Sequence, residues 1–119
     1  MITADGHLQP NSSDVGDGGT AASFIALEPM TGRFAYVANN LSASISSYTV
    51  GNTGIVTLLN GTAAAGAGPN DLANSWLYVV DAGTGTVGAF HINGDGSLTA
   101  ITGGSGLPVG RSAQGLAAY

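Results

Sequence analysis

Alternating hydrophobic and polar residues form short runs along the chain, and two of these runs share nearly the same pattern. Gly32–Asn39 and Asn74–Asp81 each lead through an aromatic residue to a Tyr-Val pair, with Tyr36 and Tyr78 42 residues apart. The same offset relates Ile45 to Val87, Tyr48 to Phe90, Val50 to Ile92, Gly54 to Gly96, and Thr57 to Thr99. Because side chains in a strand alternate between two faces, the pattern predicts short β-strands in an internal repeat of about 40–45 residues.

Clusters of Gly, Pro, Asn and Ser separate these runs and mark the ends of the expected strands. Four strands are expected at Phe24–Leu27, Phe34–Ala38, Ile45–Val50 and Ile55–Leu59, and four more at Asp71–Ala73, Trp76–Val80, Val87–Ile92 and Leu98–Thr102. In the second group only Asn74 and Ser75 separate the first two strands, which predicts a two-residue hairpin. Gly115–Ala118 has the pattern of a further first strand.

Repeats of this length made of short strands are typical of β-propellers. We therefore expect an all-β chain of four-stranded antiparallel propeller blades. Residues 1–119 form a single propeller fragment: 1–22 the end of a broken blade and a connecting loop, 23–60 a blade, 61–102 a blade, and 103–119 a loop and the first strand of a next blade. Residues 1–22 are assigned to a broken blade because Thr3–Gln9 resembles the turn at Asn93–Thr99.

Two whole blades leave strand edges and apolar faces uncovered, whereas closed propellers usually have about four to eight blades. Unpaired edges and large apolar faces favour association. The incomplete propeller is therefore expected to be completed by self-association, in a homo-oligomer that uses its terminal strands and blade faces.

The charge balance excludes two classes of partner. Only 8% of the residues are charged, and 2 Lys+Arg against 7 Asp+Glu give a net charge of −5. Without a basic patch we expect no nucleic acid and no membrane partner. There is no apolar run long enough to cross a bilayer and no signal-peptide pattern, so cytoplasmic and secreted locations both stay open. The absence of cysteine excludes disulfides, thiol catalysis and zinc-thiolate sites.

The blade motif resembles that of a known family. Its residues are Gly32–Asn40, Ser44–Tyr48 and Gly68–Asp71 in one copy, and Leu77–Val79, Gly85–Phe90 and Asp95–Leu98 in the other. They look like the blades of the seven-bladed lactonase family, which includes phosphogluconolactonase and carboxymuconate cyclase, and cover two to three of its seven blades. The resemblance implies a propeller that hydrolyses or isomerises lactones. Related surface-layer repeats share much of the motif, with Thr in place of Ala38.

The resemblance also implies where a pocket would lie: at one mouth of the central channel, among loops that enter the innermost strands and join second to third strands. Lactone chemistry needs an acid or base beside the ring and a cation or amide donors at the developing oxyanion. Asp71 is the candidate for the first role and Arg111 for the second, and the candidate ligand-binding residues are Asn39, Asn70, Asp81 and Gln114. Asp71 as a turn cap, and Arg111 as a surface or interface residue, are the structural alternatives. The sequence lacks the family's catalytic His signature, so no catalytic residue is transferred.

Histidines and aromatic residues have structural interpretations. His7 and His91 lie away from the expected pocket and at no spacing that fits a metal site, so no metal and no cofactor is expected. The aromatic residues at matching blade positions are Tyr36, Tyr48, Trp76, Tyr78 and Phe90. Their strict recurrence indicates packing between blades rather than a sugar-binding platform.

Three functions remain open: a lactonase-like fragment acting on a small sugar-acid lactone, a non-catalytic binding or scaffold repeat, and a piece of a longer propeller that folds by oligomerisation. The expected partners are other copies of the chain and a small-molecule lactone or sugar acid. Whether the chain is an enzyme stays open. Lactonase-like activity is the working hypothesis, on fold resemblance alone.

Overall fold

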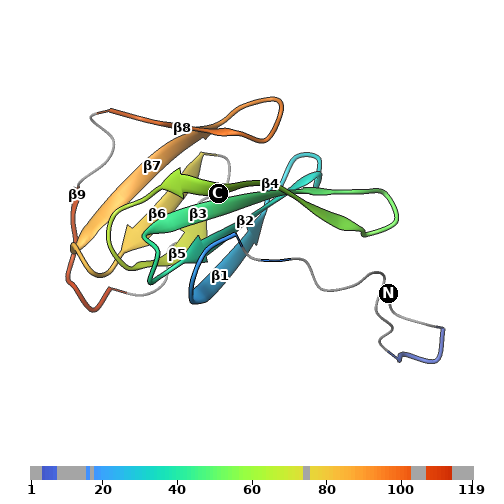
Figure 1. The fold of residues 1–119 in the computed structure, drawn as a ribbon, viewed down its shortest axis with the longest axis horizontal. Helices are drawn as coiled ribbons and strands as arrows, with labels where there is room; N and C mark the ends of the chain where they lie inside the picture. The colour runs from blue at the N-terminus through green and yellow to red at the C-terminus, as the bar shows by residue number, and fades with distance from the viewer. Residues whose placement is uncertain (1–3, 8–15, 17, 74–75, 103–106, 114–119) are drawn as a thin grey trace.

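The computed structural model of the chain describes residues 4–7, 16, 18–73, 76–102 and 107–113. Within these ranges the chain forms nine strands and no helix, so none of them holds a helix that could span a membrane (Figure 1). The all-β class is confirmed. The expected Asn74–Ser75 hairpin, the Gly115–Ala118 strand and Gln114 lie outside the described residues.

The first sheet is an antiparallel blade with strand order β1-β2-β3-β4. Its strands are β1 (Ala22–Leu27), β2 (Phe34–Asn39), β3 (Ser44–Val50) and β4 (Val56–Ala64). The last strand continues five residues beyond the expected end at Leu59, because Ala63 and Ala64 pair with the start of β3. Small residues there give no hydrophobic alternation, so the pattern did not reveal this extension.

The second sheet has the order β5-β6-β7-β8, with β9 beside β7. Its strands are β5 (Pro69–Ala73), β6 (Leu77–Asp81), β7 (Thr86–Ile92), β8 (Leu98–Ala100) and β9 (Leu107–Pro108). β8 pairs with the end of β7 and β9 with its beginning, so together they take the place that β4 has beside β3. The sheet therefore reaches Pro108, within a region expected to be a loop.

The two sheets have the same register. Tyr36 pairs with Ser47 in the first sheet, and Tyr78 pairs with Ala89 in the second, 42 residues later. Both innermost strands also carry an irregularity at the corresponding place, at Ala22/Phe24 in β1 and Pro69/Asp71 in β5. Each sheet is thus one antiparallel propeller blade, here called blade 1 (β1–β4) and blade 2 (β5–β9).

The blades pack face to face, and the core lies between them (Figure 1). The buried core residues are Ala26, Tyr36, Ala38 and Ile45 from blade 1, and Leu77, Val79 and Phe90 from blade 2. The Tyr36 hydroxyl donates to the Gly96 carbonyl at 3.2 Å. Gly96 has φ +83°, and a Cβ there would lie 2.3 Å from the Phe34 ring, so this approach requires glycine. Burial of Tyr36 and Phe90 confirms their predicted role in packing between blades, whereas Trp76 is 46% exposed and the same prediction is wrong for it within a single copy.

Candidate functional site

Loops from both blades meet on one side of the molecule, here called the entry rim: residues 18–21, 40–43, 65–68, 82–85 and 109–113. In blade 1 the Asn40 N–H donates to the Ala21 carbonyl at 2.9 Å, and in blade 2 the Ala82 N–H donates to the Gly68 carbonyl at 2.9 Å. The Asn40 Nδ2 reaches the Pro69 carbonyl at 3.4 Å and joins the two blades at this rim. The expected gathering of these loops on one rim is therefore observed.

Asn39 ends β2 at the entry rim, where its side chain is fully buried. Its Nδ2 donates to the Ser46 hydroxyl at 2.8 Å and to the Ser44 hydroxyl at 3.3 Å, while Oδ1 has no hydrogen-bond partner among the described residues. A Cβ on Gly19 would lie 2.4 Å from the Asn39 side chain. The loop that leads into β1 thus closes directly over Asn39.

Asp81 occupies the corresponding position at the end of β6 and is only 2% exposed. Burial raises the pKa of its carboxyl from 3.8 to about 6, an effect that a hydrogen bond from the Gly66 backbone N–H partly opposes. Its Oδ1 has no hydrogen-bond partner among the described residues. A Cβ on Gly66 would lie 2.5 Å from Oδ2, so the loop entering β5 lies against the carboxyl as Gly19 lies against Asn39.

These contacts give Asn39 and Asp81 a role in holding the entry loops, which the sequence analysis missed. A ligand would contact either side chain only after Gly19 or Gly66 had moved. The sequence does contain a signal for this arrangement, because each glycine lies three residues before the first strand of its blade. Their role as ligand-binding residues stays a prediction.

The remaining candidates lie at or beside the same rim. Asp71 lies in β5 opposite Val80, next to Asn70 at the strand irregularity, and only the backbone of Asn70 and Asp71 is described. Arg111 is exposed, and a Cβ on Gly85 would lie 3.1 Å from its Cγ. Arg111 therefore lies beside the turn that follows Asp81. The assignment of Asp71 and Arg111 to catalysis stays a prediction.

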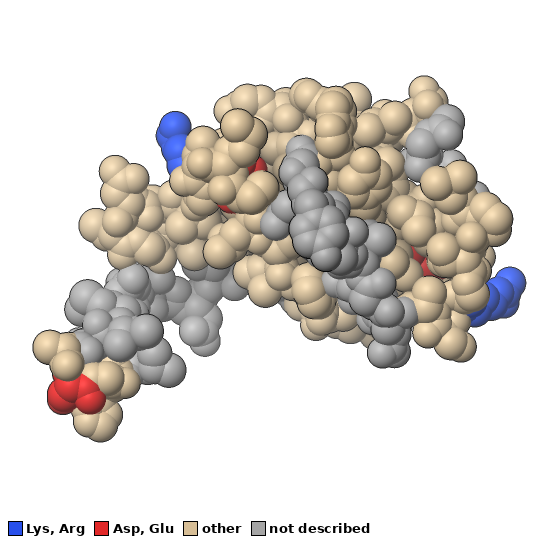
Figure 2. All heavy atoms as spheres, turned by 180° about the vertical axis from the view of Figure 1, so that it is seen from behind, with Lys and Arg blue, Asp and Glu red and all other residues tan. Residues whose placement is uncertain are grey.

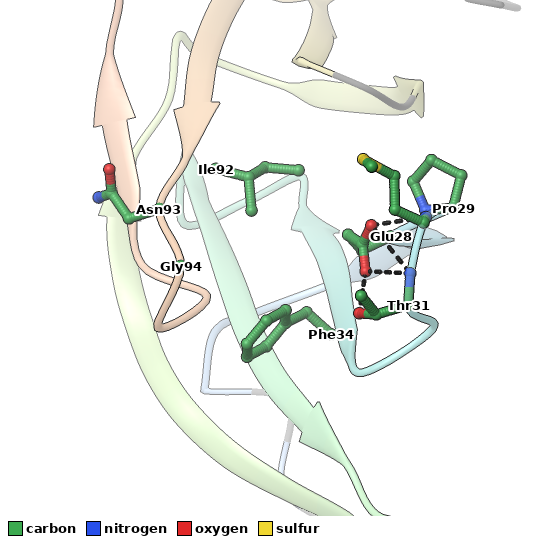
Figure 3. A pocket seen from close by; sticks show the side chains of 8 residues that line it. Glu28, Pro29, Thr31, Phe34, Ile92, Asn93 and Gly94 are labelled. Atoms are coloured by element: carbon green, nitrogen blue, oxygen red, sulfur yellow. Dashed lines mark hydrogen bonds between the residues drawn. The ribbon is translucent and has the colours of Figure 1, made fainter.

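A pocket of about 250 Å³ opens on the opposite side, between the β1–β2 and β7–β8 turns (Figure 3). Phe34 and Ile92 supply apolar lining, and Glu28 supplies the carboxylate. That carboxylate accepts hydrogen bonds from the Thr31 hydroxyl and from the Thr31 and Met30 N–H groups, which lower the pKa of Glu28. Glu28 therefore stabilises its own turn and does not point a free base into the pocket.

Charged and metal-binding groups are sparse. The two basic residues, Arg33 and Arg111, lie at opposite ends of the molecule (Figure 2). In the described ranges no three His, Asp or Glu side chains gather in a way that could hold a metal ion. His91 is exposed, with its ring 4.9 Å from that of Trp76 and its Nδ1 3.0 Å from the Asn93 Oδ1.

The solved structures that are similar to this chain include the following two. A functionally unknown protein from Desulfotomaculum acetoxidans DSM 771 is 30% identical with a TM-score of 0.66, over 85% of this chain and 32% of that one. The "putative 6-phosphogluconolactonase" of Bacteroides fragilis NCTC 9343 is 23% identical with a TM-score of 0.69, over 76% of this chain and 26% of that one. The chain thus spans about a third or less of either protein. A comparison with curated proteins finds no match.

The sequence also matches a protein family over most of its length. Residues 3–110 match the family described as "Lactonase, 7-bladed beta-propeller". The match includes both blades and the entry rim up to Gly110, in agreement with the antiparallel four-stranded architecture. The chain therefore belongs to the lactonase family of seven-bladed β-propellers, of which it contains two whole blades.

Proposed function

We propose that the chain contributes to a lactonase-like site at the entry rim, which opens or isomerises a small sugar-acid lactone. The observation that carries the proposal is the position of Arg111, one of only two basic residues, exposed on that rim in a chain of the lactonase family. The name of the Bacteroides fragilis protein supports a phosphorylated sugar-acid lactone as the first substrate to test.

Hydrolysis assigns one role to each candidate. The Asp71 carboxylate takes a proton from a water molecule whose oxygen attacks the lactone carbonyl carbon. The Arg111 guanidinium stabilises the negative charge that develops on the carbonyl oxygen. The ring C–O bond then breaks, and the ring oxygen takes up the proton held by Asp71, which restores the carboxylate and leaves an open-chain hydroxy acid.

The test is the initial rate of lactone opening, corrected for the spontaneous reaction. Arg111→Ala should lower kcat by about 10²–10³-fold, the range found for removal of one oxyanion donor. Arg33→Ala is the matched control, because Arg33 is also exposed but precedes β2 at the opposite rim. The rate of lactone opening by Arg33→Ala should equal that of the parent. Equal rates in the two variants, or no rate above the spontaneous one in the parent, would refute the catalytic proposal.

Burial of Asn39 and Asp81 favours a second candidate, a non-catalytic scaffold repeat. Two of the four predicted ligand-binding residues are held against entry-loop glycines rather than exposed at the rim. If the chain is a scaffold, the parent should turn over no lactone. Arg111→Ala should then fold and melt as the parent does. Saturable lactone hydrolysis by the parent would exclude it.

A further inference from the structure

Blade 1 has an apolar face that no described strand covers, here called the first open face: Ile25, Leu27, Ala35, Val37, Tyr48 and Val50. A cavity of about 310 Å³ lies over it, and Ile25 and Leu27 are 62% and 55% exposed. Ala35 and Tyr48 are buried, and the Tyr48 hydroxyl donates to the Gly16 carbonyl at 3.1 Å, so the uncovered part of the face is at Ile25 and Leu27. In blade 2 the corresponding positions, 42 residues later, are Leu77, Val79, Phe90 and Ile92. Those residues pack against blade 1. The first open face is therefore built like a surface that already binds a blade within the chain.

Blade 2 presents the complementary surface, here called the second open face: Trp76 and Tyr78 at the start of β6. These residues correspond to Phe34 and Tyr36, which pack over Gly96 between the blades. Trp76 is 46% exposed and Tyr78 is half-buried, whereas Tyr36 is fully buried. Farther along the same face, Val80 and Ala89 are buried. The outer part of this face thus carries two aromatic side chains that lack the cover their counterparts have.

The β3–β4 turn of blade 1 has the same backbone shape as the β7–β8 turn, which packs against Phe34 and Tyr36. In the β7–β8 turn the Asn93 N–H donates to the Ser97 carbonyl, and in the β3–β4 turn the Gly51 N–H donates to the Ile55 carbonyl, at 2.9 and 2.8 Å. The glycines of the two turns, Gly96 and Gly54, have φ +83° and +79°. Gly96 is buried beneath aromatic rings, but Gly54 is exposed. Gly54 therefore has the backbone conformation of Gly96, the glycine that contacts Phe34 and Tyr36, but lacks their cover.

We propose that copies of this chain associate head to tail, with the first open face of one copy against the second open face of the next. The Tyr78 hydroxyl of one copy donates to the Gly54 carbonyl of its neighbour, and Trp76 covers that glycine. This contact repeats the Tyr36–Gly96 contact within the chain and does not depend on lactone chemistry. A heterologous contact of this kind can close into a ring, and three or four copies would supply six or eight blades, on either side of the seven of the family.

The test uses two variants, Leu27→Glu on the first open face and Trp76→Asp on the second. Both side chains are about half exposed, so each change leaves the fold of a single copy intact but places an unpaired charge in the contact. By sedimentation velocity, each variant alone should dissociate at concentrations about tenfold or more above the parent. An equimolar mixture of the two variants should form dimers and nothing larger. The intact second open face of Leu27→Glu can still bind the intact first open face of Trp76→Asp, and the other two faces are blocked. Met30→Glu, at a 90% exposed residue outside both faces, is the control and should assemble as the parent does.

Trp76 is the only tryptophan in the chain, so its emission reports on the second open face alone. The parent emission should shift to the blue as mass rises with concentration. Far-UV circular dichroism and cooperative melting check that each variant is folded, and Ile25→Glu replaces Leu27→Glu if that variant is not. A parent that stays a single chain would overturn the proposal, since another protein or a further propeller segment would then cover the faces. Variant mixtures that do not dimerise, or assembly without an emission shift, would overturn the head-to-tail arrangement.

Discussion

Asn39 and Asp81 take matching places in the two blades, but only Asp81 titrates. Both end the second strand of a blade, both are buried, and each lies against a glycine of the entering loop. The amide of Asn39 meets two serine hydroxyls, whereas Asp81 has Gly88 and Thr86 at the corresponding positions. The carboxyl therefore depends more on the Gly66 N–H, and its charged form is disfavoured by burial.

The first prediction concerns the pH dependence of stability. Because folding raises the pKa of Asp81 from 3.8 to about 6, the folded state favours the protonated carboxyl. The protonated Asp81 carboxyl contributes its full share of the free energy of unfolding below pH 3.8. This contribution is lost as the pH rises through about 6, at a cost of up to about 3 kcal/mol. Urea unfolding at fixed protein concentration should show this loss in the parent and not in Asp81→Asn. The pKa values of Glu28 and Asp95 are lowered in the folded state, which gives a pH dependence of the opposite sign. Both residues are present in the parent and in Asp81→Asn, so their effects cancel when the two stability profiles are subtracted.

The reciprocal variant tests the same idea in blade 1. Asn39→Asp places a carboxyl in a site that is fully buried, so stability should fall more steeply with rising pH than in the parent. The Ser44 and Ser46 hydroxyls can donate to the new carboxylate, which predicts a smaller change than the one at Asp81. A pH profile that matches the parent would show that burial at this position does not control ionisation.

At the scale of single elements, the entry loops depend on glycines that leave room for the side chain at the end of the second strand of the same blade. Gly66→Ala would place a Cβ 2.5 Å from the Asp81 Oδ2 and should lower the free energy of unfolding by about 1–3 kcal/mol. Gly94→Ala is the matched control, because a Cβ there meets no atom within 4 Å. Thermal or urea unfolding compares the two, and equal stabilities would show that the loop relaxes without cost.

Elements with strong alternation were predicted well, and those with small residues were not. Tyr36, Val37, Tyr78 and Val79 mark β2 and β6, where Tyr36 and Val79 enter the core between the blades and Val37 and Tyr78 lie on the open faces. The end of β4 and the short β9 contain Ala, Leu and Pro with no alternation, and only pairing with β3 and β7 makes them strands. The entry rim was also predictable, because once the strands are placed their order determines which loops meet at one end of the blades. Burial of Asn39 and Asp81 was not, because it depends on the backbone approach of Gly19 and Gly66.

At the scale of the whole molecule, two blades leave one apolar face open at each end. The open faces of blade 1 and blade 2 carry hydrophobic residues at the positions whose counterparts, 42 residues away, already pack together inside the chain. The chain spans 32% and 26% of the two similar structures, and further blades are needed to close a ring. Head-to-tail copies supply them and would place several entry rims around one channel, each with its own Arg111.

Small-angle X-ray scattering with in-line chromatography decides whether copies assemble head to tail into a ring, because it gives both the mass and the shape of the particle. Head-to-tail assembly predicts a particle of a fixed number of chains whose scattering fits a closed ring with a central channel, at every concentration above the assembly threshold. Scattering that fits a single elongated chain, or a mass that grows without limit with concentration as in an open filament, would contradict it.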